Sequence, residues 1–207
     1  MTDFGKYHRM NTVHLINMGG KPLSRVIENP KQLILGQAKE ILYHQGYHKL
    51  SMRALSKACD IALGTIYNYY PTKKDLVVEM MTDYWQNYLD SVREIVNSET
   101  DIYLKLNNVF KELEGFIKSF RLYWLTPELY VNQEYVDGGL QKEYLYMEKL
   151  IAIIEAVLIE EAAENNIHIN LGARETANFI IMNFITIVQT PLFKYESFEL
   201  FLKELLK

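Results

Sequence analysis

Hydroxyl, amide and ammonium side chains are concentrated between Ser51 and Leu76. Ser51 directly precedes a helical pattern, so its hydroxyl and the N-terminus of that helix are expected to hold a phosphate. Lys73 lies in the first turn of a further helical segment and offers a positive charge to phosphate. Asn68 carries an amide that pairs with adenine through two hydrogen bonds in direct readout. These residue types in one short segment predict contacts with duplex DNA.

Two short helices are expected to position these groups. Ser51 is the predicted cap of the first helix, MRALSKAC, because its hydroxyl accepts unpaired backbone N–H groups. Asp60 marks a tight turn, and a second helix is predicted from about Ala62 to Tyr69. Thr72 and Asp75 form a capping box that begins the next helix. This order of elements predicts a helix-turn-helix unit followed at once by a long helix.

The same segment resembles the TetR family of bacterial one-component transcription regulators. The family pattern is a first helix ending in Gly-aromatic, a second helix led by Thr or Ser, and a third beginning Gly-Thr-hydrophobic-Tyr. The chain matches this pattern over residues 33–80, with Gly46-Tyr47, Ser51, Leu55, Gly64-Thr65-Ile66-Tyr67, Tyr69-Tyr70, Lys73 and Leu76. It departs from the pattern at Leu55-Ser56, where Ile-Ala is favoured, and at Ala62, where a small hydroxyl residue is usual.

The resemblance implies that Tyr67 and Tyr69 contact the DNA backbone or thymine methyl groups, and that Gly64 permits close approach. For Tyr67 and Tyr70 the alternative role is packing within the small domain, and we prefer this role for Tyr70. The Arg53 side chain is expected either to contact a phosphate or to remain in solvent without contacting DNA. The best candidates for base edges are Leu63, Thr65 and Asn68. The full set of expected DNA-binding residues is Ser51, Arg53, Ala62, Leu63, Gly64, Thr65, Tyr67, Asn68, Tyr69 and Lys73.

The composition is that of an ordinary globular protein. Of 207 residues, 49% are apolar and 23% charged, which excludes wholesale disorder. The single cysteine, Cys59, excludes an internal disulfide framework and a cysteine-based zinc finger. His44 and His48 have the spacing of a metal pair on a helix, but Gly46 lies between them and no third ligand is near. We therefore expect no metal and no cofactor.

The charge is distributed unevenly along the chain. Residues 1–76 hold 11 Lys/Arg and 5 Asp/Glu, a net charge of +6, whereas residues 77–207 hold 11 and 21, a net charge of −10. Such a split suits a protein that presents one end to phosphates, although chance asymmetry is the alternative. No apolar run is long enough to cross a membrane, and the N-terminus lacks the apolar core of a signal peptide, so we expect a cytoplasmic protein.

Three segments follow from the pattern of apolar residues and helix breakers. Residues 1–29 are an N-terminal extension, which either follows the DNA as an arm or makes no DNA contact. Residues 30–76 are the expected helix-turn-helix domain, and residues 77–207 the expected helical ligand-binding and dimerisation domain. In the last segment, apolar residues recur at helical spacing and no alternating strand pattern is long enough for a sheet. The predicted fold class is all-α.

Helix breakers divide the C-terminal segment further. Thr126-Pro127-Glu128 predicts the start of a short helix, and Gly138-Gly139 is expected to end it. A long helix follows up to Asn165-Asn166, and Pro191 separates the last two helices. These two helices are apolar on more than one side, which predicts burial against a second copy of the chain. Members of the family it resembles dimerise through this region; a monomer core is the alternative.

Aromatic residues predict a ligand site in the same segment. It holds nine tyrosines and two tryptophans, which combine apolar area with hydrogen-bonding groups. Ordinary core packing is the alternative role for each of them. The residues expected to line a pocket for an aromatic or amphipathic ligand are Trp85, Tyr88, Phe110, Tyr123, Tyr144, Met147 and Phe179.

The predicted function is that of a ligand-responsive transcriptional regulator, expected to be a repressor. It would bind a near-palindromic operator as a homodimer and be released by a small amphipathic or aromatic molecule. The alternative is a ligand-independent helix-turn-helix module that binds DNA or other proteins. An enzyme is the rival class, but the sequence has no Gly-rich phosphate loop, no nucleophile elbow and no HExxH motif.

Overall fold

The computed structural model describes residues 28–124 and 133–207 apart from Pro191 and Phe193, with the backbone alone in 133–141. All regular elements in these residues are helices, which confirms the predicted all-α class. Residues 1–27 of the predicted N-terminal extension and the predicted cap at Thr126-Pro127-Glu128 lie outside the described residues, as does the predicted break at Pro191.

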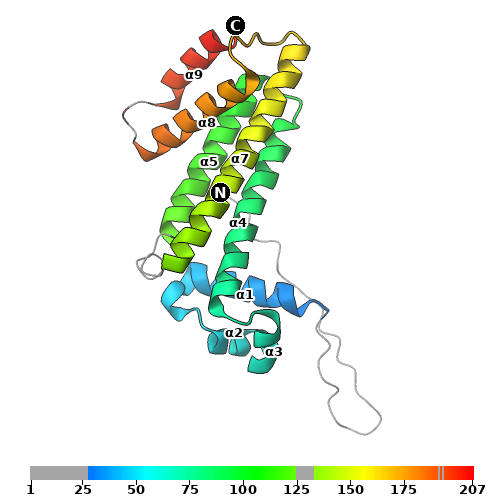
Figure 1. Cartoon of the computed structure of the whole chain (residues 1–207), viewed down its shortest axis with the longest axis vertical. Coiled ribbons are helices and arrows are strands. Elements are labelled where there is room, and N and C mark those ends of the chain that lie inside the picture. Colours follow the sequence, from blue (N-terminus) through cyan, green and yellow to red (C-terminus); the bar gives the residue numbers. More distant parts are fainter. Residues whose placement is uncertain (1–27, 125–132, 191, 193) are drawn as a thin grey trace.

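The first three α-helices form a small cluster at one end of an elongated molecule (Figure 1). The long helix α4 leaves this cluster with α5 and α7 beside it, and α8 packs on α7 and α5. α9 lies at the far end and contacts α5. The helices of the cluster are α1 (Pro30–Gln45), the 3₁₀ turn η2 (Tyr47–Lys49), α2 (Met52–Cys59) and α3 (Leu63–Tyr69). The remaining helices are α4 (Lys73–Val96), α5 (Ile102–Tyr123), α7 (Gln133–Ala163), α8 (Ala173–Gln189) and α9 (Tyr195–Leu205).

Side-chain caps mark the start of several helices, among them α1 and α4. The Asn29 side chain accepts a hydrogen bond from the Gln32 N–H, and Pro30 occupies the first helical position. The Thr72 hydroxyl accepts from the Asp75 N–H while the Asp75 carboxylate accepts from the Thr72 N–H, at 3.1 and 3.0 Å. The capping box was predicted from the sequence, because such a cap depends only on residues within one turn.

Two glycines do not act as predicted. Helix α7 begins at Gln133 and passes through Gly138 and Gly139 without interruption, so the expected break there is wrong. Glycine lowers helix stability by about 1 kcal/mol relative to alanine but leaves the i→i−4 hydrogen bonds intact. The predicted end at Asn165-Asn166 is confirmed, since α7 ends at Ala163 and Asn165, two residues on, adopts the left-handed conformation (φ 60°).

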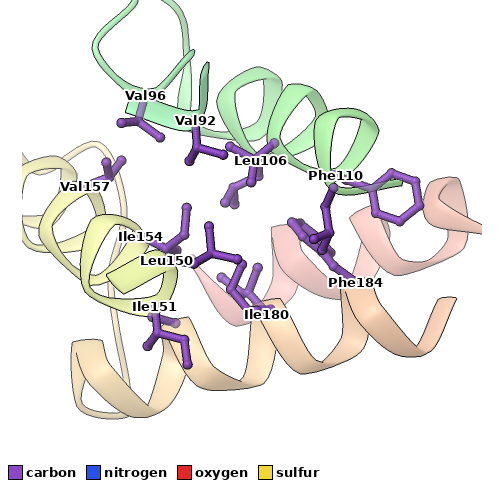
Figure 2. Packing of buried hydrophobic residues seen from close by; sticks show 14 of the residues in the cluster. Val92, Val96, Leu106, Phe110, Leu150, Ile151, Ile154, Val157, Ile180 and Phe184 are labelled. Carbon is purple, nitrogen blue, oxygen red and sulfur yellow. The ribbon is translucent and has the colours of Figure 1, made fainter. Parts of the chain in front are cut away.

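Buried apolar side chains form two clusters. We call the first the head core; it joins α1, α2 and α3 to the start of α4 and includes Ile34, Leu55, Ile66 and Met80. We call the second the body core; it lies between α4, α5, α7, α8 and α9. Figure 2 shows side chains of the body core converging from different helices, including Val92, Leu106, Ile154 and Ile180. Helix α4 contributes to both cores; the domain boundary at residues 76/77 stays a prediction.

Helix α8 is not buried on all sides within one chain. Ile180, Ile181 and Phe184 point into the body core, whereas Phe179 and Met182 are 46% and 55% exposed. Helix α9 likewise exposes Leu200 and Phe201. These four side chains leave apolar surface on both C-terminal helices. None of the described helices is long and apolar enough to cross a membrane.

Candidate functional site

The turn between α2 and α3 is held by a network of hydrogen bonds. Asp60 adopts the left-handed conformation (φ 54°), and the N–H groups of Asp60 and Ile61 donate back to the carbonyls of Lys57 and Ser56. This is the Schellman arrangement at a helix C-terminus. The Ser56 hydroxyl also donates to the Ile61 carbonyl at 2.7 Å. Ser56, which departs from the family pattern, therefore closes the turn, a role that sequence reasoning missed.

The inner faces of α2 and α3 are fully packed. Leu55, Cys59, Ile61 and Ile66 are buried in the head core. Burial raises the pKa of the Cys59 thiol to about 11, so this cysteine is a packing residue rather than a reactive one. With one side of both helices used for packing, the angle between α2 and α3 is fixed and their other side faces solvent.

The exposed side of α3 carries the predicted base-reading residues. Tyr67 is 45% exposed and Tyr69 39%, although both are large aromatic side chains that a core normally covers. Asn68 lies between them and is also exposed, whereas Leu63 and Thr65 are half-buried. Tyr70, by contrast, is buried in the head core, in line with the packing role preferred for it.

Gly64 is exposed at the start of α3. A Cβ atom built at this residue would meet no atom of the described residues within 4 Å, and its φ is not in the left-handed region. Neither packing nor backbone conformation within this chain therefore requires glycine there. A molecule that approaches α3 closely would supply the requirement.

Two further candidates flank α2 and α3. The Ser51 side chain accepts a hydrogen bond from the Ala54 N–H at 3.1 Å, which leaves the hydroxyl hydrogen to donate to a phosphate. Arg53 is exposed in the first turn of α2, and Ala62 is exposed ahead of α3. The Ala62 side chain makes no cap hydrogen bond.

The Lys73 side chain is held by contacts with Tyr47. Its ammonium lies 3.6 Å from the ring centroid of Tyr47 and donates to the Tyr47 carbonyl at 3.4 Å. This pairing joins η2 to the N-terminus of α4 and holds the positive charge at that point. The charge therefore lies at the edge of the α2–α3 surface.

The comparison with known proteins identifies this unit. Residues 34–80, which span α1 to the first turns of α4, match the family described as "Bacterial regulatory proteins, tetR family". Its helix-turn-helix is that of the TetR family of transcriptional regulators. This confirms the resemblance inferred from the residues between Gly46 and Leu76.

Relatives in the TetR family extend the match beyond the helix-turn-helix. The "Fatty acid metabolism regulator protein" of Bacillus subtilis is 20% identical over 174 residues, which cover 84% of this chain and 89% of that protein. The regulator UidR of Escherichia coli K12 is 34% identical over 61 residues, 30% of this chain and 31% of UidR. These relatives are named as regulators, not as enzymes.

Solved structures share the fold. A transcriptional regulator from Cytophaga hutchinsonii aligns with a TM-score of 0.67 at 15% identity, covering 79% of this chain and 82% of that one. FadR from Bacillus subtilis, solved in complex with stearoyl-CoA, aligns with a TM-score of 0.53 at 21% identity, covering 77% and 85%. At these identities the likeness establishes the all-helical TetR-type fold.

The predicted ligand-binding residues are not gathered at one place. Trp85 and Tyr88 lie together in the body core, and Met147 is partly buried against it. Phe110 contacts Phe184 and Tyr195, with ring centroids 5.3 and 4.6 Å away. The remaining three are Tyr123, which packs against the head core, and Tyr144 and Phe179, which are exposed.

Phe116 and Tyr146 complete the aromatic group around Trp85 and were missed from the sequence. The Trp85 ring stacks on Tyr146 at 5.3 Å and lies 4.4 Å from Phe116, measured between centroids. The Tyr88 hydroxyl is buried beside them without a hydrogen-bond partner among the described residues. Burial, with a smaller effect of the Glu112 charge, raises the pKa of Tyr88. A neutral hydroxyl in apolar surroundings is therefore present for a polar group of a ligand.

No group of three or more His, Cys, Asp or Glu residues within the described part of the chain is arranged to hold a metal ion. His44, one of the two histidines considered for such a site, instead lies 3.2 Å from the Glu40 carboxylate on the same helix.

Proposed function

We propose that this regulator binds a near-palindromic operator as a homodimer, inserts α3 into the major groove and represses transcription until a small amphipathic or aromatic molecule releases it. The observation that carries the DNA part is the exposed side of α3. Tyr67, Asn68 and Tyr69 are exposed there, and two of them are large aromatic residues. No contact or backbone conformation among the described residues requires glycine at Gly64. The flanking Ser51 and Lys73 would bind phosphates and set the register of α3 on the duplex.

The apolar surface of α8 and α9 supports the homodimer. Phe179 and Met182 on α8 and Leu200 and Phe201 on α9 are all exposed in the single chain. Fully burying a large apolar side chain is worth about 1.5–3 kcal/mol, and these side chains are roughly half exposed, so each would contribute about half of that towards the cost of association. Two-fold symmetry would place the two copies of α3 about 34 Å apart, one turn of DNA.

The body core supports an amphipathic effector. Trp85, Phe116 and Tyr146 offer apolar rings, and the buried Tyr88 hydroxyl offers one hydrogen bond. A TetR-type relative, FadR of Bacillus subtilis, has been solved with stearoyl-CoA, which is amphipathic. We therefore propose acyl-CoA thioesters as the first effectors to test for this chain, with free aromatic acids as the second.

Selection of bound sequences from random duplex DNA, followed by a release screen, tests the proposal. The expected result is an inverted repeat that binds the protein and is released by one member of the effector set. If an inverted repeat is selected and no small molecule releases it, the ligand-independent module is favoured. If no sequence is enriched at physiological salt, the proposed DNA binding is wrong.

A further inference from the structure

Trp124 connects the two cores from an unexpected side. It follows directly after α5, whose buried residues from Ile102 to Phe116 belong to the body core. Its own side chain, however, is 2% exposed and lies in the head core, together with residues of α1, α2 and α3. A residue more than 40 positions beyond the helix-turn-helix thus completes the packing of that unit.

The preceding residue contacts the head as well. The Tyr123 ring lies 4.6 Å from the Tyr43 ring of α1, measured between centroids, at an interplanar angle of 50°. On the α4 side, the Tyr84 ring lies 6.1 Å from Trp124, and its hydroxyl donates to the Phe116 carbonyl at 2.9 Å. The end of α5 is therefore held between α1 and α4.

Ion pairs join α1 to the same stretch of α4. The Lys31 ammonium lies 2.9 Å from the Glu79 carboxylate, and the Lys39 ammonium pairs with Asp83. Asp83 also has an electrostatic effect on Tyr43, whose pKa is raised to about 12 by burial first and by this charge second. The joint thus contains α1, α4 and the end of α5, and both aromatic contacts and ion pairs hold it together.

The geometry has a mechanical consequence. The head packs on the start of α4, and without another contact it would follow any bending or twisting of that helix relative to the rest of the body. A second contact that lies off the axis of α4 limits this movement, because α1 is then held by α5 as well as by α4. Tyr123 and Trp124 supply the second contact.

We propose that Tyr123 and Trp124 form a latch that fixes the orientation of the helix-turn-helix relative to the body, in addition to the covalent connection through α4. Movement of α5 in the body is then transmitted directly to α1. The latch itself needs neither DNA nor effector; only its use in regulation rests on the proposed function.

Electron–electron distance measurements on the full chain test the latch. Spin labels are attached to Lys57→Cys on α2 and Lys111→Cys on α5, both exposed positions, in a Cys59→Ala background. Labelled protein is diluted with unlabelled protein so that pairs within one chain dominate. We expect Trp124→Ala to broaden the distance distribution and Trp124→Phe to keep it narrow, because phenylalanine still fills the site.

Leu122→Ala is the matched control, since Leu122 lies in the same turn of α5 and is 68% exposed. It should leave the distribution unchanged, and far-UV circular dichroism should show the same helix content in all folded variants. If Trp124→Ala does not fold, Tyr123→Ala replaces it, because Tyr123 is only half-buried and its loss removes the ring contact with Tyr43. A distribution as narrow as that of the parent in the folded variant overturns the latch. This measurement does not depend on DNA affinity, so its result is independent of whether the proposed function is correct.

Discussion

Individual side chains in this protein divide into those that hold the fold and those that face a partner. Lys105 on α5 and Glu161 on α7 illustrate the first kind, with their ammonium and carboxylate 2.9 Å apart and side chains only 13% and 9% exposed. Asn166 donates a further hydrogen bond to the Glu161 carboxylate at 2.9 Å. Desolvation raises the pKa of Glu161, but these two partners outweigh it and the net shift is downward.

Breaking this pair should destabilise the protein in a pH-dependent way. We expect Lys105→Met to lower the free energy of unfolding by about 3–5 kcal/mol near neutral pH, because an unpaired carboxylate is left buried. A carboxyl whose folded pKa is lowered stabilises the fold above its unfolded pKa of about 4.3 and loses that contribution as the pH falls through the folded value. The difference between wild type and variant should therefore shrink in urea titrations below about pH 4.

Lys118→Met supplies the comparison for this measurement. Lys118 and Glu114 lie 3.0 Å apart, but their side chains are 66% and 40% exposed. Water screens such a pair, so the loss should be about 0.5 kcal/mol or less at any pH. Equal losses in the two variants would contradict the structural role assigned to Lys105.

Asn68 and Lys73 represent the second kind and should differ in what they contribute. Asn68→Ala should reduce discrimination between operator and mutated operator by about 1–3 kcal/mol, the value of one bidentate contact to a base. Lys73→Ala should weaken operator and random DNA alike and reduce the slope of log affinity against log salt by about 0.9. Fluorescence anisotropy titrations at several salt concentrations measure both. The assignment of this surface fails if neither variant changes operator binding.

At the scale of elements, α3 is a short helix that exposes a glycine. No contact among the described residues requires glycine at that position. Its seven residues place Ile66 in the head core and leave Gly64 open to solvent. A helical glycine costs about 0.5–1 kcal/mol relative to alanine. The chain therefore carries a local stability cost at the point where α3 is proposed to approach DNA.

Replacing Gly64 should separate stability from DNA binding. We expect Gly64→Ala to raise the free energy of unfolding slightly while weakening operator binding about tenfold or more, which is about 1.4 kcal/mol. Gly115→Ala on α5 is the matched control, since a Cβ atom there also meets nothing within 4 Å. It should stabilise the protein to a similar extent and leave DNA affinity unchanged. Undiminished operator affinity in Gly64→Ala would contradict the close approach of α3.

Helix ends and apolar stripes were predictable from the sequence because they depend on nearby residues. The caps at Asn29, Ser51 and Thr72 each involve one turn of chain, and the buried face of α1 follows from its spacing. The continuity of α7 through Gly138-Gly139 was not predictable in this way, because two glycines weaken a helix without specifying where it ends.

Contacts between elements distant in sequence could also not be predicted from the spacing of apolar residues. Nothing in the spacing of α5 distinguishes Trp124, which enters the head core, from Phe116, which enters the body core. Among the expected ligand-binding residues, spacing likewise did not separate the buried Trp85 from the exposed Tyr144. Rotation of a helix about its axis and its distance from its neighbours decide these outcomes, and both are tertiary properties.

At the scale of the whole molecule, a basic end and an acidic body with an exposed apolar face together suggest a two-fold assembly on DNA. Met182→Arg places a charge in the proposed α8–α9 contact, next to its symmetry-related copy. Sedimentation velocity should then show a monomer at concentrations at which the wild type is a dimer. Leu122→Arg, an equally drastic change of an exposed leucine outside this contact, should remain dimeric. If both variants remain dimeric, the dimer interface does not involve this surface of α8 and α9.

The spacing of the two half-sites tests the central claim most directly, because the body is proposed to set the separation of the two DNA-reading helices. Operators selected from random DNA should contain two inverted half-sites about one helical turn apart, on one face of the duplex. Inserting five base pairs between them should reduce affinity to that of a single half-site, since half a turn moves one half-site to the opposite face. Unchanged affinity after the insertion, or selected sequences without inverted symmetry, would contradict the account.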